Sequence, residues 1–191
     1  SAQLNQRMLA TTLDEDLESF ESGLHLIALN MRSGPQHRYT MVDRLPMSSE
    51  RDYLDWLARL EKLPEQLKQY QALLESGVQT ERTQARIIIE RIPNQLDALI
   101  VDDPEDSPFW GVFENMPKAI ESTTAETLKN KARLVISASL TPAYAEFKAF
   151  IEERYLPNSR EQPGIGSLPG GKTIYAMLAR HFTTTDLTPE Q

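Results

Sequence analysis

The chain has 191 residues, a formal charge of −8 and a hydrophobic share of 40%, which suits a globular domain large enough to enclose a core. The acidic balance argues against binding to nucleic acid or to an anionic membrane surface, because both require clustered Lys and Arg side chains. The absence of cysteine excludes disulfides, thiol nucleophiles and thiolate metal sites, and no apolar run reaches the roughly 20 residues of a membrane span.

The first quarter of the chain predicts helices followed by an irregular connection. Large apolar residues recur near helical spacing within residues 3–31 and predict one or two helices there. Residues 32–47 contain Gly34-Pro35 and Pro46, which favour an irregular segment.

A long apolar face begins after Ser48 and Ser49, either of which can cap a helix. Pro64 interrupts the pattern and is most easily accommodated as the first residue of a second helix, which ends at Gly77. This segment is therefore expected to be a helical hairpin or a kinked rod.

Residues 80–100 carry the longest apolar pattern and are predicted to form one buried helix kinked at Pro93. Further along, Thr123-x-x-Glu126 matches a capping box, and Thr141-Pro142 matches a cap followed by a first-turn proline, so each is expected to open a helix. Six aromatic side chains at helical spacing are expected in the core: Tyr53, Tyr70, Tyr144, Phe147, Phe150 and Tyr155.

No pattern typical of a β-hairpin is present, so the predicted fold class is all-α, an irregular multi-helix bundle. Residues 1–191 are expected to form a single helical region. Within it, residues 1–47 would supply leading helices and residues 48–191 the helical core.

The closing residues predict one more helix, which follows Pro169-Gly-Gly and carries four large side chains near one face: Ile174, Tyr175, Leu178 and Phe182. Beyond this helix, Thr188 has the character of an N-cap and Pro189 that of a first helical residue. Because a capping hydroxyl is useful only when amide donors follow it, the chain is expected to be the leading part of a longer protein.

Few side chains are candidates for metal or acid–base chemistry. The three histidines, His25, His37 and His181, lack the HExxH spacing that holds zinc. The acidic residues at 102–106 lack the glycine and the final Glu of a calcium loop and are interpreted as a solvated loop. No catalytic residue and no metal site are assigned in this chain.

Residues Gly166 to Thr173 match the spacing of the phosphate-binding loop GxxxxGK[ST]. A functional loop of that kind follows a buried strand, whereas residues 158–165 are mostly polar and contain a proline. Pro169 also removes one of the amide donors that would hold a phosphate. Nucleotide binding is therefore not predicted.

Tyr175 and His181 are the candidate substrate-binding residues. They lie about two helical turns apart, next to the polar run Thr183-Thr184-Thr185, and would line a cleft. The alternative interpretation is a helix end that simply finishes in capping threonines.

The closing segment resembles a bacterial family known as domain of unknown function 885. The resemblance rests on Leu168-Pro-Gly-Gly, an aromatic residue at Tyr175, and His181-Phe-Thr-Thr-Thr-Asp-Leu-Thr-Pro-Glu. Segments 52–60, 77–99 and 141–157 agree with the same family in order. The resemblance covers most of the chain from about residue 45, and its specific part is the closing segment, whereas the other segments are ordinary helical patterns.

This resemblance implies a helical zinc metallopeptidase of the HExxH type, often exported or lipid-anchored. The zinc ligands and the catalytic Glu of such proteins lie beyond the Thr-Pro-Glu segment, so no cofactor is expected in this chain and zinc is expected in the full-length protein. Residues 1–191 would then form a wall or lid of the substrate cleft, inactive alone, in a periplasmic or exported lipoprotein. The expected partners are the remainder of the polypeptide and a peptide substrate, with no nucleic acid and no membrane span.

A second function, from a different class, stays open at this point. The chain could instead be a freestanding helical module that binds another protein through an apolar groove and has no enzymatic activity. The two hypotheses differ in surface character. A portion of a larger protein is expected to expose an apolar patch and to self-associate, whereas a module is expected to have a polar surface.

Overall fold

A computed structural model describes residues 2–185, and this part of the chain is all-α, as predicted. Its only extended pairing is an isolated bridge between Ala85 and Arg160. The α-helices are α1 (Ala2–Glu21), α2 (Glu50–Gln79), α3 (Arg86–Ile89), α4 (Ile92–Asp97), α5 (Gly111–Glu114), α6 (Ser122–Val135), α7 (Thr141–Phe150) and α8 (Gly171–Thr183). The 3₁₀ turns are η1 (Leu24–Leu26), η2 (Pro35–Arg44), η3 (Pro104–Asp106), η6 (Leu156–Asn158) and η7 (Ile165–Ser167), and the π turns are η4 (Ile136–Leu140) and η5 (Ile151–Tyr155).

Helix α2 is one continuous helix of 30 residues. Ser49 caps it, as predicted, in a capping box: the Asp52 amide donates to the Ser49 hydroxyl, and the Ser49 amide donates to the Asp52 carboxylate at 2.8 Å. Of the two predicted forms, a hairpin or a kinked rod, the hairpin is wrong, because Pro64 lies inside the helix. An internal proline costs about 3 kcal/mol, and each buried Leu on this face, such as Leu60 and Leu67, contributes about 1.5–3 kcal/mol. Burial therefore outweighs the cost of the proline.

The second long helix is a composite of α6, η4, α7 and η5, which follow one another without a break. Helix α7 begins at Thr141 with Pro142 in its first turn, but the predicted cap at Thr141 is wrong, because the helix continues from η4 without a break. The π turn η4 ends immediately before Thr141. Its wider hydrogen-bond spacing accommodates Pro142, which has no amide hydrogen. The predicted capping box is also wrong: α6 begins at Ser122 after Glu121, so Thr123 already lies within the helix.

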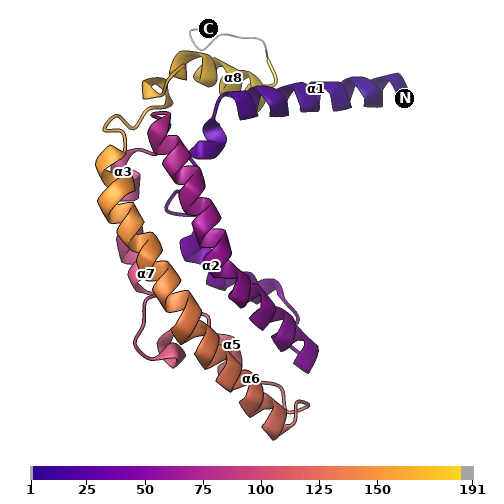
Figure 1. Cartoon of the computed structure of the whole chain (residues 1–191). Coiled ribbons are helices and arrows are strands. Elements are labelled where there is room, and N and C mark those ends of the chain that lie inside the picture. Colours follow the sequence, from indigo (N-terminus) through magenta and orange to yellow (C-terminus); the bar gives the residue numbers. More distant parts are fainter. Residues whose placement is uncertain (1, 186–191) are drawn as a thin grey trace.

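The core lies between α2 and the composite helix, which run side by side in the same direction (Figure 1). The prediction of an aromatic core is confirmed, with Tyr53, Tyr144, Phe147 and Tyr155 buried and Tyr70 and Phe150 half-buried against them. The tyrosine hydroxyls fix the irregular segments to this core. Tyr144 donates to the Pro35 carbonyl at 3.0 Å, and Tyr155 accepts from the Gln84 amide at 2.9 Å.

The single helix predicted for residues 80–100 is wrong. Thr80 is the C-cap of α2, Glu81 adopts a left-handed conformation with φ 59°, and the chain then forms the two short helices α3 and α4. Pro93 lies in the first turn of α4 and therefore marks a helix start, not a kink. The apolar residues serve a packing role on both helices, with Ile89, Ile92 and Leu96 buried.

Helices α1 and α8 lie together at the end of the long helices where α2 finishes (Figure 1). The helix predicted within residues 3–31 is confirmed, but α1 has no buried residue. Its neighbour α8 is held by a small separate cluster in which Leu168, Ile174 and Met177 are buried. This end of the molecule is therefore packed much more thinly than the core.

An ion pair joins the two long helices near this end and gives a prediction for acid stability. Arg154 of η5 donates through two nitrogens to the Glu75 carboxylate, at 2.7 and 3.0 Å, and these hydrogen bonds lower the pKa of Glu75 from its ordinary 4.5. Because the folded pKa is below the unfolded one, the stabilisation is present above about pH 4.5 and is lost as the pH falls through the folded pKa. Glu75→Gln should therefore show a smaller loss of stability on acidification than the wild type. Urea unfolding above and below this pH measures the difference, and Glu153→Gln, at an exposed position of the same composite helix, should behave like the wild type.

Candidate functional site

The glycine pair before α8 is explained by backbone packing. Gly170 has φ 72°, a left-handed conformation that favours glycine, and a Cβ on Gly171 would lie 2.4 Å from the Ile165 carbonyl oxygen. The segment before this pair is the 3₁₀ turn η7, so the prediction that no strand precedes it is confirmed. The match to a phosphate-binding loop therefore reflects a tight turn that seats α8 against residues 165–168.

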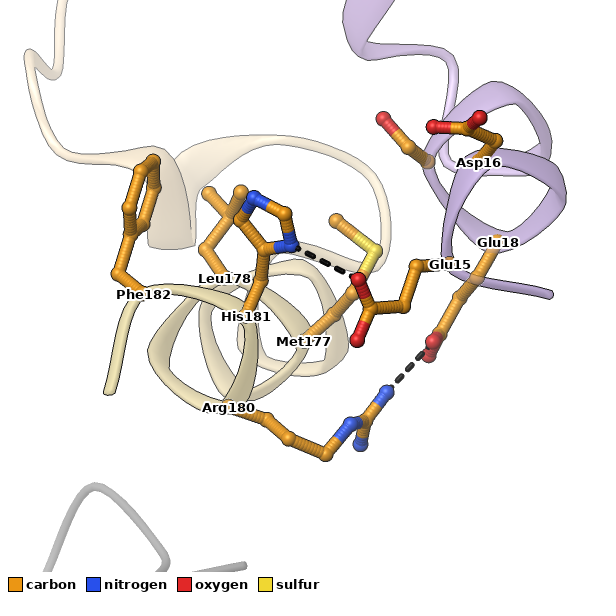
Figure 2. A pocket seen from close by; sticks show the side chains of 9 residues that line it. Glu15, Asp16, Glu18, Met177, Leu178, Arg180, His181 and Phe182 are labelled. Carbon is orange, nitrogen blue, oxygen red and sulfur yellow. Dashed lines mark hydrogen bonds and ion pairs between the residues drawn. The ribbon is translucent and has the colours of Figure 1, made fainter. Parts of the chain in front are cut away.

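A cleft between α1 and α8 is the candidate site (Figure 2). Its volume is about 280 Å³, and its lining residues are Glu15, Asp16, Glu18 and Ser19 of α1 and Met177, Leu178, Arg180, His181 and Phe182 of α8. One hydrogen bond and one ion pair cross it. The His181 Nδ1 donates to the Glu15 carboxylate at 3.2 Å, and the Arg180 guanidinium pairs with Glu18.

The two walls of the cleft differ in chemistry, with carboxylates on α1 and the Arg180 guanidinium and the His181 imidazole on α8. A short peptide segment carries amide donors and carbonyl acceptors. Such a segment could bind between these walls if its own groups replaced the exposed contacts between the two helices. His181 is held by a carboxylate in the way that a general base is held, and Ser19 lies in the same cleft. The structure shows no hydrogen bond between the Ser19 hydroxyl and His181, so a nucleophile–base pair is not formed.

The two residues predicted from the sequence are separated by the structure. His181 lines the cleft, whereas Tyr175 does not. Tyr175 and His181 are six residues apart, and at about 100° per residue their side chains point about 120° apart around α8. The four apolar residues expected near one face are likewise divided: Ile174 is buried, Leu178 is half-buried, and Tyr175 and Phe182 are exposed. Thr184 is the left-handed C-cap of α8, as the alternative interpretation of the threonine run requires.

The other candidate groups have local structural roles. The His25 ring stacks on Phe20 with centroids 4.5 Å apart, and the His37 Nε2 is 2.9 Å from the Met31 carbonyl oxygen. In the acidic loop, Asp103 caps η3 and Glu105 pairs with Arg133. Across residues 2–185, no group of three or more His, Asp or Glu side chains is arranged to hold a metal ion.

Sequence reasoning missed Glu15, Glu18 and Arg180, which form half of the polar lining. The contacts across the cleft join residues more than 160 positions apart, so no local spacing could indicate them. The proposed caps Thr188 and Pro189 lie outside the described residues. Within residues 2–185, no helix has both the length and the apolar character that crossing a bilayer demands.

Comparison with known proteins gives a family and a fold. The family described as bacterial protein of unknown function (DUF885) matches residues 1–191. A crystal structure of a candidate lipoprotein from Colwellia psychrerythraea is similar over 86% of this chain, with a TM-score of 0.77 and 19% sequence identity. The chain spans only 29% of the length of that protein. Among curated proteins, none matches the sequence.

Proposed function

The chain belongs to the bacterial family of unknown function DUF885, and on that premise we propose that it is the N-terminal helical portion of a zinc-dependent metallopeptidase-like protein. In this role it forms part of the wall or lid of the substrate cleft and is not catalytic by itself. The similarity to a structure of which the chain spans 29% supports a portion of a longer protein, and the description of that structure as a candidate lipoprotein supports export.

The observation that carries the proposal is the exposed face of α1. Leu9, Leu13, Leu17 and Phe20 recur at intervals of four, four and three residues, which places them on one face, and each is more than half exposed. At about 100° per residue, this α1 stripe points away from Glu15 and Glu18, which face α8. A stripe of this kind on a helix without buried residues is the pattern of a surface that packs against further polypeptide.

The α1–α8 cleft supplies the substrate contacts in this proposal. His181 and Glu15 would bind the backbone or a polar side chain of a peptide, and the exposed Phe182 at the rim would contact an apolar one. Tyr175, the other predicted contact, lies outside this cleft and would join the surface that the remainder of the polypeptide covers. Residues 2–185 do not fit a zinc site, so no chemical step is assigned to them.

The test compares residues 1–191 with the full-length protein for bound zinc, by elemental analysis, and for cleavage of a fluorogenic peptide library. We expect stoichiometric zinc and cleavage only in the full-length protein, and His181→Ala there should raise KM while zinc content stays unchanged. Stoichiometric zinc in residues 1–191, lost on His→Ala substitution, would contradict the proposal, as would a full-length protein without zinc.

The alternative is a helical module that binds another protein through an apolar groove. The exposed α1 stripe departs from the polar surface expected of such a module. Size in solution distinguishes the two. As a portion of a larger protein, residues 1–191 should self-associate and the full-length protein should not. If residues 1–191 are monomeric and bind a defined partner protein through Leu13, the module would be favoured.

A further inference from the structure

A second groove, separate from the α1–α8 cleft, lies between η2 and α2 and has a volume of about 340 Å³. Its wall is mainly apolar and includes Met41 of η2 and Trp56, Leu60 and Leu63 of α2. Ligand sites span about 300–1,000 Å³, so the groove is large enough for one small molecule or one alkyl chain. None of its lining residues belongs to the α1–α8 cleft.

The charged residues that line this groove are all cationic, although the chain as a whole carries a charge of −8. They are Arg38, Arg59 and Lys62. Lys62 has an exposed partner in Glu65 at 3.3 Å, and the structure shows no carboxylate paired with Arg38 or Arg59 within residues 2–185. The groove therefore presents unneutralised positive charge beside an apolar wall, which is complementary to an anion with an apolar body.

Two of the residues that line this groove each carry a buried donor with no hydrogen-bond partner in the described part of the chain. The donors are the Arg38 Nε and the Trp56 indole Nε1, and the Trp56 side chain is only 2% exposed. Buried donors of this kind are nearly always satisfied in folded proteins, by protein, water or ligand atoms. Both atoms are donors and belong to residues that line one groove, so a group that satisfies them must be an acceptor.

We propose that the groove binds an aliphatic monocarboxylate of the fatty-acid type. Its alkyl chain lies along Met41, Leu60 and Leu63, and its carboxylate accepts from the Arg38 guanidinium and the Trp56 indole after a small shift of these side chains. Arg59 and Lys62 at the rim add attraction to the same negative charge. A carboxylate fits better than a neutral acceptor because an arginine pairs with it through two parallel hydrogen bonds.

The first experiment follows the indole N–H signals of the ¹⁵N-labelled chain in a proton–nitrogen correlation spectrum. The chain has two tryptophans, Trp56 and Trp110, and Trp56→Phe assigns their signals. Decanoate is expected to shift the Trp56 signal and to leave that of Trp110 in place. Decanol, which has the same chain without the charge, is expected to cause no comparable shift. An equal effect of decanol, or no effect of decanoate below its micelle-forming concentration, would overturn the proposal.

Titration calorimetry of the full-length protein with decanoate then tests the cationic residues. Arg38→Gln is expected to weaken binding about tenfold or more, since hydrogen bonds to charged groups are among the stronger ones. Arg59→Gln, on the exposed helix surface, is expected to weaken it less and serves as a second variant if Arg38→Gln does not fold. Arg51→Gln removes the same charge from α2 outside the groove, where Arg51 pairs with Asp55, and is expected to bind like the wild type.

Three results would count against this ligand. Equal weakening by Arg51→Gln and Arg38→Gln would mean that only net charge matters. No decanoate binding by the full-length protein would mean that other polypeptide covers the groove. Binding of N-acetyl-leucine as tightly as decanoate would assign the groove to the carboxyl end of a peptide and not to an alkyl chain.

Discussion

Replacing Leu13 with Glu is expected to leave residues 1–191 folded and to destabilise the full-length protein severely. Leu13 lies in the middle of the α1 stripe and is 53% exposed, so in residues 1–191 the change should alter the free energy of unfolding by less than about 0.5 kcal/mol. If further polypeptide covers the stripe, the same change removes a buried Leu and buries a charge. Loss of a buried Leu alone costs about 2–5 kcal/mol.

Denaturant unfolding of both lengths measures this contrast. Thr11→Glu introduces the same charge on α1 at an exposed position about 160° away from Leu13 by helical geometry, and it should be neutral in both lengths. Leu13→Glu should also reduce self-association of residues 1–191, as followed by sedimentation. A full-length protein that tolerates Leu13→Glu as well as Thr11→Glu would show that the stripe is a free surface, and the proposed role of α1 would then be wrong.

The parts of the fold that the sequence predicts are those decided by local chemistry. Ser49 caps α2 because Asp52 stands three residues later, and both side chains reach the backbone without help from distant residues. The aromatic residues from Tyr144 to Tyr155 recur at a helical period, which fixes their common face whatever that face packs against. Fold class and core could therefore be predicted.

Predictions from local chemistry are wrong where packing between distant segments competes with it. Pro64 and Pro142 are strong signals for a helix boundary, yet both lie within long helices because buried leucines and a π turn compensate for the missing amide. In residues 80–100 the opposite occurs. The apolar period continues through residue 100, but the bridge between Ala85 and Arg160 and the first-turn position of Pro93 divide the segment.

The candidate site was predicted least well, because its geometry depends on the meeting of two distant helices. The sequence indicates His181 by its place near a polar run, but the carboxylate that holds it, Glu15, comes from the other end of the chain. Tyr175 is close to His181 in sequence, but helix geometry directs its side chain away from the cleft. The sequence therefore identified one of the two helices that form the cleft and could not identify its partner.

The well-packed core and the thinly packed α1–α8 pair lie in different parts of the molecule. The long helices enclose nearly all of the buried aromatic residues, whereas α8 rests on three buried side chains and α1 on none. Surface ion pairs such as the one between α1 and α8 contribute about 0–1 kcal/mol each. The α1–α8 pair therefore buries little apolar surface against the core, which is the character expected of the proposed wall or lid.

Phe147→Ala is expected to have the largest effect in residues 1–191. Phe147 is 1% exposed on α7, and its ring meets Tyr70 of α2 edge-on with centroids 6.5 Å apart, so it joins the two long helices directly. Removing a buried Phe ring costs about 3–5 kcal/mol, a large part of the stability of a domain this size. Phe182→Ala is the matched control, because Phe182 is 79% exposed and the same truncation there should change the unfolding free energy of residues 1–191 by less than about 0.5 kcal/mol. Chemical denaturation followed by circular dichroism compares the two variants, and similar losses in both would mean that the core does not lie between α2 and α7.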